Sequence, residues 1–206
     1  MEMKVSSANK PRPSILLKYG IIEAHQRGEF SFLPSVPPTS KEFDGLIHRA
    51  SAESREVFCN KHIMKHGEVW GLKDGDIFLD FAIQDLNGRT RRAVPFWPSR
   101  VYAEYVAEAI AKPLCAEAVQ LFTFIDTILL NELPMRKLLV AIFWIPGKRT
   151  AIRGARQEAI SWVDSFCYRL NLEPPSGGSL SDADYMKLLK AAYARPMKAG
   201  PRGKLP

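Results

Sequence analysis

Two short turn sequences constrain the fold more than any other feature of this chain, because each lies between segments with the pattern of a β-strand. The first turn is at residues 73–76, and the second is at residues 86–89, where the Asn87-Gly88 pair accepts a positive φ. The strand segments that flank these turns cover residues 68–72, 76–85 and 89–96. The pattern predicts an antiparallel meander of three strands.

A helix pattern stands on each side of the meander in the chain. Before it, residues 51–66 are predicted to form a helix that Ser51 caps and Gly67 ends. After it, Ser99 is expected to cap a helix over residues 100–112. The meander is therefore predicted to be flanked by helices.

Strand and helix patterns continue to alternate after residue 112. Residues 115–123 have a strand pattern, and residues 124–133 have that of a short apolar helix ended by Pro134. The apolar run 137–145 is typical of a central strand buried on both faces, and residues 152–170 of a last helix. The element order α-βββ-α-β-α-β-α predicts an α+β fold with packed helices and a mainly antiparallel, or mixed, sheet.

The distribution of tryptophan and proline divides the chain into three parts. All four tryptophans lie between residues 70 and 162, and the core α+β domain is predicted over residues 51–170. Residues 1–50 form an N-terminal extension that is partly irregular and rich in proline. Residues 171–206 hold a Pro/Gly/Ser linker, a helix predicted over residues 181–195 and a basic tail that is expected to be disordered.

Composition narrows the class of protein. Hydrophobic residues make up 46% of the chain and charged residues 25%, as in an ordinary globular protein. No apolar run approaches the roughly 18–20 residues of a membrane span, and the N-terminus lacks the pattern of a secretory signal. The three cysteines are widely spaced, which fits neither a disulfide framework nor a zinc site. We expect a cytoplasmic protein without a membrane or cofactor partner.

The net charge of +7 raises the question of a nucleic-acid partner. The predicted core carries sixteen Lys/Arg and fourteen Asp/Glu, so more than half of the excess lies outside it. A dedicated nucleic-acid domain concentrates its positive charge on the folded body. Charge alone therefore gives nucleic acid only weak support as a partner.

Residues 93–106, AVPFWPSRVYAEYV, are the most distinctive stretch of the chain. Trp97 stands between Pro95 and Pro98, where its ring could line a ligand groove or anchor a buried corner between a strand and a helix. Pro95 ends the ladder of its strand because it has no N–H to donate, and Pro98 biases Trp97 towards an extended backbone. With Ser99 as the cap of the next helix, each residue has a structural role. The sequence favours the corner.

Three groups of side chains contain the residue types of a reactive site. His62 and His66 have the spacing of half a metal site, but no third ligand is evident. Cys59 lies on the same predicted helix, where packing in the core is the commoner role of a cysteine. The acidic hairpin around Asp74 and Asp80 lacks the spacing of a calcium loop, and turn chemistry accounts for it. We assign no catalytic, cofactor-binding or metal-binding residue.

Two basic clusters contain no acidic residue. They consist of Arg89, Arg91 and Arg92 in the first cluster, and Lys148, Arg149, Arg153 and Arg156 in the second. If the clusters meet in space, they would form a surface for an anionic ligand or a partner. Arg153 and Arg156 are expected to share a face near the start of the last helix. A solvated charged surface without any ligand is the simpler interpretation.

Several motifs give the chain a resemblance to a known family. They contain Trp70, Gly71, Leu72, Pro95, Trp97, Pro98 and Ser99. Together with the late run that ends in Phe-Trp, they resemble the W-G-L … P-F-W-P-S … A-I-F-W pattern of the bacterial domain-of-unknown-function family twenty-seven fifty, over roughly residues 55–163. The basic segment 88–92 stands where that family has an acidic hairpin. The resemblance implies a fold, and it brings no reaction and no catalytic residue.

Because no reactive constellation is evident, the leading hypothesis is a non-catalytic protein-binding domain. Such a domain could be an adaptor, a regulator or an immunity-type protein that neutralises a toxin, the last by analogy with other small α+β proteins. One alternative is a nucleic-acid-associated protein that uses the arginine clusters and the basic tail. The other is an enzyme of unrecognised type with a site near Trp97. The burial of Trp97 and the distance between the clusters distinguish these hypotheses.

Overall fold

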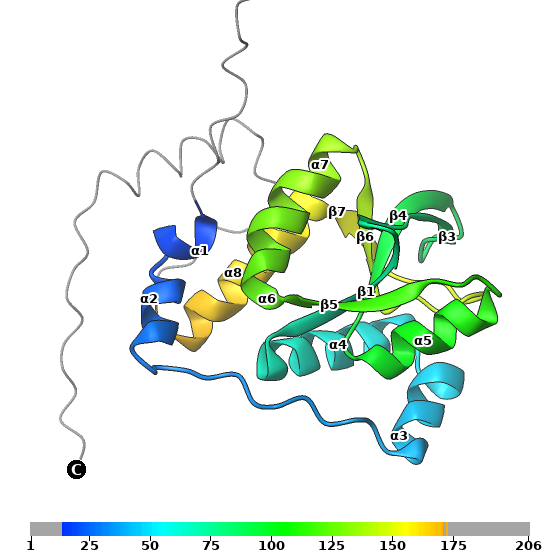
Figure 1. Ribbon diagram of the computed structural model, residues 1–206, viewed down its shortest axis with the longest axis horizontal. Helices are drawn as coiled ribbons and strands as arrows, with labels where there is room; N and C mark the ends of the chain where they lie inside the picture. Colours follow the sequence, from blue (N-terminus) through cyan, green and yellow to red (C-terminus); the bar gives the residue numbers. More distant parts are fainter. Residues whose placement is uncertain (1–13, 171, 173–206) are drawn as a thin grey trace, which may run out of the picture.

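The fold is α+β, as the element order predicts. The computed structural model describes residues 14–170 and residue 172, and it has a mixed, mostly antiparallel sheet of seven strands with helices packed against it (Figure 1). The helix predicted over residues 181–195 and the basic tail lie outside the described residues. In the part of the chain that the structure describes, no helix is both long enough and apolar enough to cross a membrane.

The sheet has the strand order β2-β1-β4-β6-β7, with β3 paired to β4 and β5 paired to β1. Its strands are β1 (Glu68–Asp74), β2 (Ile77–Phe78), β3 (Phe81–Gln84), β4 (Thr90–Trp97), β5 (Cys115–Gln120), β6 (Leu139–Ile142) and β7 (Ile152–Gly154). Only the β4–β6 pairing, among those of the described strands, is parallel. β6 lies between β4 and β7 and is buried from Val140 to Ile142, as predicted for the apolar run.

Both predicted turns are confirmed, but the single strand predicted over residues 76–85 is wrong. β2 runs antiparallel to β1, and β3 runs antiparallel to β4, which is itself antiparallel to β1. The chain therefore reverses its direction at Leu79 and Asp80, between β2 and β3. β1 consequently pairs directly with β4, through the Trp70–Trp97 register. Alternation of apolar residues indicates a strand, but it does not indicate which neighbour the strand joins.

The helices that surround the sheet in the chain agree with the sequence in type, except for α6, and they differ from it at their ends. They are α4 (Ala52–His66), α5 (Arg100–Ala109), α6 (Leu121–Thr123), the π-helical η2 (Phe124–Glu132), α7 (Leu133–Met135) and α8 (Ala155–Arg169), of which α4 precedes the sheet. Ser51 caps α4 by accepting a hydrogen bond from the Ser54 N–H at 3.1 Å, and Gly67 ends it at φ 72°. Pro134 lies in the first turn of α7, where a missing N–H costs nothing, so it does not end the helical segment.

Three predicted details of the helices are wrong. Ser99 stands at the N-cap position of α5, but its hydroxyl makes no capping hydrogen bond. The strand predicted over residues 115–123 ends at Gln120, where α6 begins. The start of the last predicted helix is instead β7, because Arg153 pairs with Val140 of β6. Arg153 and Arg156 therefore lie in a strand and in a helix, and they do not share a helix face.

The described part of the N-terminal extension packs on the core. It contains α1 (Ile15–Lys18), α2 (Ile21–Gln26), α3 (Ser40–Asp44) and the π-helical η1 (Gly45–Arg49). Helix α1 begins on Asp126 of η2, whose carboxylate accepts a hydrogen bond from the Ile15 N–H at 3.1 Å and another from the Ser14 hydroxyl. Phe43 of α3 stacks on Tyr102 of α5 with ring centroids 5.2 Å apart. Both ends of this extension are therefore fixed to the core.

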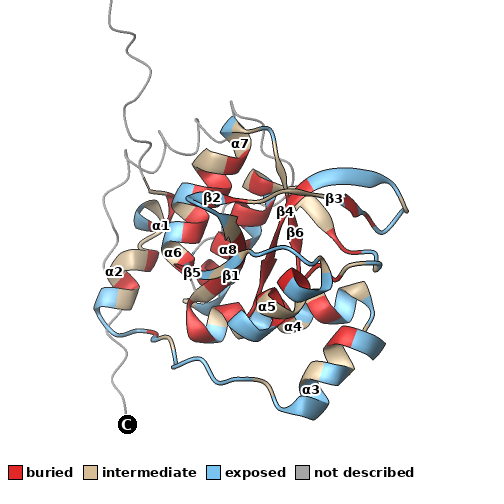
Figure 2. Ribbon diagram, turned by 45° about the vertical axis from the view of Figure 1, so that its right-hand side comes forward, coloured by how far each residue is buried: buried red, intermediate tan, exposed pale blue. Residues whose placement is uncertain are grey.

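Residues 28–39, which we call the strap, connect α2 to α3 along the outside of α4 (Figure 1). The Leu33 N–H donates to the Lys65 carbonyl at 2.9 Å, and the Leu33 carbonyl is bonded to His66 Nδ1 at 2.9 Å. The Phe32 ring packs directly on Gly67, in the space that a β-carbon would occupy. The strap is thus held at the C-terminal end of α4, while most of its other residues remain exposed (Figure 2).

Candidate functional site

Trp97 is a buried corner residue and does not line a groove. Its side chain has no exposed surface, and its Nε1 donates to the Trp144 carbonyl at 2.8 Å. On the neighbouring strand, Gly71 leaves room for the Phe78 ring, since an added methyl group there would lie 2.5 Å from that ring. The W-G-L and F-W-P-S residues therefore pack β1 against β4, and the interpretation of Trp97 as a corner is confirmed.

Arg55 is the most unusual buried side chain of the protein. It is only 2% exposed, and its guanidinium donates to three backbone carbonyls: Ala50 at 2.8 Å, Arg149 at 2.8 Å and Phe143 at 3.3 Å. Burial lowers the pKa of Arg55. Phe143 has a positive φ of 53°, at the point where the chain leaves β6. Arg55 therefore joins the start of α4 to the loop after β6, which is a structural role.

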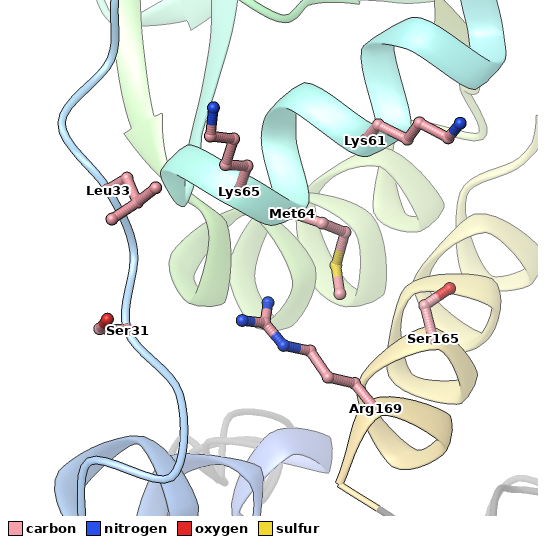
Figure 3. A pocket seen from close by; sticks show the side chains of 7 residues that line it. All are labelled: Ser31, Leu33, Lys61, Met64, Lys65, Ser165 and Arg169. Atoms are coloured by element: carbon pink, nitrogen blue, oxygen red, sulfur yellow. The ribbon is translucent and has the colours of Figure 1, made fainter.

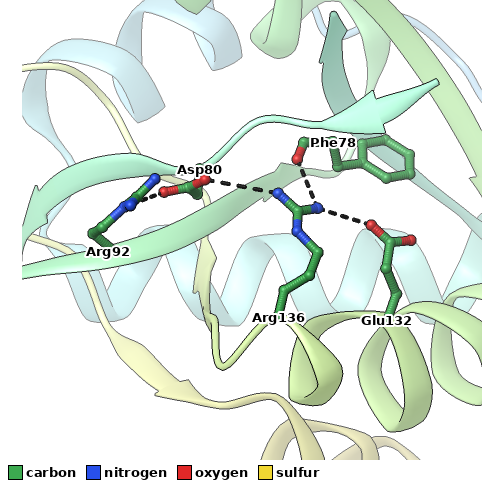
Figure 4. A network of polar contacts seen from close by, with 5 residues as sticks. All are labelled: Phe78, Asp80, Arg92, Glu132 and Arg136. Carbon is green, nitrogen blue, oxygen red and sulfur yellow. Dashed lines mark hydrogen bonds and ion pairs between the residues drawn. The ribbon is translucent and has the colours of Figure 1, made fainter. Parts of the chain in front are cut away.

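The first basic cluster is largely neutralised by carboxylates. Arg91 pairs with Asp85 at 3.4 Å, and Arg92 pairs with Asp80 at 2.5 Å. Figure 4 shows that Asp80 lies between Arg92 and Arg136, and that Arg136 reaches Glu132 and the Phe78 carbonyl as well. These contacts hold the chain where it reverses between β2 and β3. Asp80, from the predicted acidic hairpin, therefore forms ion pairs with arginines of the same chain.

The second basic cluster meets the first at one point. The Arg149 guanidinium lies against Gly88 and donates to the Leu86 carbonyl at 3.4 Å, so it covers the turn that contains Arg89. Lys148 donates to the His48 carbonyl at 2.9 Å. Arg153 pairs with Glu56 of α4 and, at 3.1 Å, with Glu158 of α8. Burial raises the pKa of Glu158, which Arg153 opposes.

These contacts connect the turns, strands and helices of the core to one another. Arg91, Arg92 and Arg153 have carboxylate partners, and Arg149 contacts Gly88 and Leu86 in the turn next to the first cluster. The contacts therefore do not support a continuous surface made of all seven predicted cations.

The residues of α4 that have reactive side chains do not converge on a site. The rings of His62 and His66 are 4.3 Å apart, but the described residues contain no group of three His, Cys, Asp or Glu side chains that could hold a metal ion. Cys59 is fully buried, and burial raises the pKa of its thiol well above the usual value. A thiol held in its neutral form is a poor nucleophile. Cys59 and His66 are buried in the core, and His62 is partly buried beside them.

His62 gives the stability of the protein a dependence on pH. Burial, with smaller contributions from His66 and Lys65, lowers the pKa of His62 to about 4, whereas a histidine in an unfolded chain titrates near about 6.5. Below pH ~6.5 the unfolded chain takes up this proton first, so the free energy of unfolding should fall with decreasing pH until about pH 4. We expect a loss of the order of 1 kcal/mol, because the ring is partly exposed and screened by solvent.

Urea unfolding of the wild type and of His62→Gln across this pH range measures the effect. The difference between their free energies of unfolding should change through the window and be constant above it, since the other titrating groups are common to both proteins. Parallel curves from pH 7 to pH 4 would show that His62 takes up its proton equally well in the folded state.

A hollow that combines apolar and cationic side chains lies along the outer face of α4. Its first part, of about 340 Å³, lies between the strap, α4 and α8 and is lined by Ser31, Leu33, Lys61, Met64, Lys65, Ser165 and Arg169. Its second part, of about 430 Å³, continues along α4 and is lined by Glu53, Ser54, Val57, Phe58 and Lys61. Lys61 belongs to both parts. We call the whole the α4 groove.

The α4 groove combines exposed apolar surface with positive charge. Leu33 is 50% exposed and Val57 is 48% exposed. Figure 3 shows Met64 and Arg169 pointing into the space between the strap, α4 and α8, while the ammonium groups of Lys65 and Lys61 point away from the centre of that space. The Arg169 guanidinium is held 5.4 Å from the centre of the Phe30 ring.

Sequence analysis did not identify the α4 groove. Its residues come from three segments, near residues 31–33, 53–65 and 165–169, which only the fold brings together. The one local signal is the spacing of Val57, Lys61 and Lys65, which repeats every four residues and so places them on one face of the helix.

Comparison with known proteins gives one match. The family described as "Protein of unknown function (DUF2750)" matches residues 57–157, from within α4 to the first turn of α8. No curated protein and no solved structure matches the chain. The match confirms the family expected from the motifs, and it covers all seven strands of the sheet but neither the strap nor the end of α8. Residues 57–157 of this chain therefore match the DUF2750 family, a family of unknown function.

Proposed function

We propose that this chain is a non-catalytic protein-binding domain that holds an acidic, partly apolar segment of a partner protein in the α4 groove. The observation that supports this function is the set of three groove cations, Lys61, Lys65 and Arg169, which line exposed apolar surface without an ion pair inside the described part of the chain. An adaptor or a regulator would act in this way. An immunity-type protein is the case in which the partner is a toxin.

The charge of the groove supports an acidic partner. Elsewhere on the protein, Arg91, Arg92, Arg136 and Arg153 have carboxylate partners within the fold. The groove cations have none there, so their charge is available to another molecule. Complementary charge increases the rate of encounter and rejects partners of the same sign. An acidic segment is therefore favoured over a basic one.

The apolar side chains of the groove support a protein as the partner. Half-exposed Leu33 and Val57, with the flexible Met64 between cationic side chains, resemble the centre of a protein interface with a charged rim. Helix α4 has fifteen residues, which gives a length of about 22 Å at about 1.5 Å per residue. A strand-like segment of about seven residues has a similar length. The groove therefore suits a short linear segment.

The alternative functions have less support. A nucleic-acid surface on the core would need the arginine clusters, but three of their members neutralise carboxylates of the fold. An enzyme with a site near Trp97 would need that ring to face a cavity, but it is fully buried and lines neither part of the α4 groove. Protein binding needs only the exposed side chains of the α4 groove, so it is the function we favour.

A displayed library of random peptides tests the proposal without knowledge of the natural partner. Selection on the full chain should enrich peptides that combine Asp or Glu with large apolar residues. The variant Lys61→Glu/Lys65→Glu/Arg169→Glu should bind a selected peptide at least about tenfold more weakly, which corresponds to about 1.4 kcal/mol.

A matched control has the same change of charge elsewhere. Lys41, Lys112 and Lys137 are exposed and, within the described residues, make no ion pair. The variant Lys41→Glu/Lys112→Glu/Lys137→Glu should bind the peptide within about threefold of the wild type. Equal weakening by both variants would mean that only the net charge matters, and the α4 groove would then not be the site. Selection of basic peptides, or of none, would also contradict the proposal.

A further inference from the structure

β5 is an edge strand whose outer side has no partner. Among the described strands it pairs only with β1. Just beyond β5, the Leu121 N–H donates to the Gly67 carbonyl at 2.8 Å. Hydrogen bonding alternates along an antiparallel ladder, so Glu117 and Val119 also direct their backbone groups towards β1.

The backbone groups of the alternate residues therefore point away from the sheet. These residues are Ala116, Ala118 and Gln120. In the described part of the chain, no hydrogen bond joins the outward N–H groups of these three residues, or the carbonyls of Ala116 and Ala118, to another residue. The Gln120 carbonyl faces α6, because Gln120 is the N-cap residue of that helix. Ala118 and Gln120 are exposed. β5 thus presents three donors and two acceptors to the outside in the geometry of a strand.

The outer side of β5 also lacks the features that normally prevent pairing. Natural edge strands are usually protected by lysine, proline or a bulge. Here the three outward residues are small or uncharged, and the only charge of the strand, on Glu117, is held by Lys73 at 2.6 Å. Pro113 precedes the strand and does not interrupt it. An unprotected edge strand of six residues can pair with a strand of another molecule.

We propose that the occupant of this edge is the β5 strand of a second copy of the chain, paired antiparallel about a two-fold axis at Ala118. A symmetric antiparallel pair has a residue opposite its own copy at the axis, and that residue must direct its backbone groups outward. Ala118 is the central residue of the three that do so. Ala118 then faces the partner's Ala118, and Ala116 faces the partner's Gln120.

The side chains of such a pair are compatible with one another. In this register Glu117 lies opposite the partner's Val119, so like charges do not face each other across the axis. The small side chain at the axis leaves the two backbones free to approach to hydrogen-bonding distance. This self-complementarity favours a second copy over an unrelated strand. The pairing uses no residue of the α4 groove, so it is independent of the proposed function.

Sedimentation velocity of the full chain over a wide range of concentration tests the inference. The wild type should shift from monomer to dimer as concentration rises. Ala118→Pro should remain monomeric, because proline removes the outward N–H at the axis, and it should stay folded, because proline is tolerated where the N–H of an edge strand faces away from its neighbour. Far-ultraviolet circular dichroism verifies that the variant is folded.

Oxidative cross-linking gives a second measurement that does not depend on the proline. In a Cys115→Ser background, Ala118→Cys should form a disulfide-linked dimer, because paired α-carbons about 5.5 Å apart lie within disulfide range. Glu108→Cys, which is exposed on α5, is the matched control and should not cross-link efficiently. A wild type that stays monomeric throughout, a dimer that survives Ala118→Pro, or equal cross-linking of the two cysteine variants would overturn the proposal.

Discussion

Replacing Trp97 with alanine is expected to lower the free energy of unfolding by about 3–5 kcal/mol. The side chain is fully buried, its strand position is paired with that of Trp70, and its Nε1 donates to the Trp144 carbonyl. The substitution removes this hydrogen bond and leaves a cavity where β1, β4 and the start of α5 meet. Urea denaturation followed by tryptophan fluorescence or circular dichroism measures the change.

Trp97→Phe separates the two contributions. It keeps most of the ring volume but leaves the Trp144 carbonyl without its donor, so its cost should be well below that of alanine. A loss below about 1 kcal/mol for Trp97→Ala would mean that the ring is not part of the core. The interpretation of Trp97 as a groove residue would then return.

Replacing Arg55 with alanine is expected to be similarly destabilising, by about 3 kcal/mol or more. Each buried carbonyl that loses its donor costs about 1–3 kcal/mol, and Arg55 serves three of them. The release of a buried charge offsets only part of this cost. The start of α4 and the loop after β6 would lose their connection, and thermal or urea unfolding measures the loss.

Arg55→Lys is the informative comparison. Lysine keeps the positive charge but cannot reach three carbonyls that diverge from one another, so most of the stability should still be lost. Arg49→Ala, at an exposed arginine nearby, should change the free energy of unfolding by less than about 0.5 kcal/mol. If Arg55→Lys were as stable as the wild type, charge alone would explain the role of Arg55.

The elements that the sequence predicted correctly are those with local causes. Helix α4 has a cap at Ser51 and a stop at Gly67, and both turns have a glycine at positive φ, Gly75 and Gly88. The run that contains β6 is apolar on both faces because the strand lies between two others. In each case a few neighbouring residues determine the backbone, so the pattern is readable without the fold.

The incorrect predictions concern segments whose conformation depends on contacts between residues far apart in the sequence. The reversal at Leu79 and Asp80 is held by Arg92 and Arg136, which are twelve and fifty-six residues from Asp80 in the chain. Arg153 enters a strand because β6 offers an edge to pair with, although its local sequence is compatible with a helix. Pairing and charge neutralisation over such separations leave no local pattern.

The candidate site was the least predictable part of the protein for the same reason. The basic clusters are conspicuous in the sequence, but in the fold Arg91, Arg92 and Arg153 neutralise carboxylates. Lys61 and Arg169 belong to no motif or cluster in the sequence. In the fold, they line the same hollow between the strap, α4 and α8. Whether a cation is available depends on where the acidic residues of the fold are, which the sequence does not indicate.

Site-specific photo-crosslinking tests the binding role of the α4 groove most directly. A benzophenone amino acid replaces Val57 in the groove or, as the control, the similarly exposed Ile77 of β2. Each protein is irradiated with a peptide from the library selection. We predict a covalent peptide adduct at position 57 that an excess of unlabelled peptide abolishes, and little adduct at position 77. Equal adducts at both positions, or an adduct only at position 77, would contradict the account.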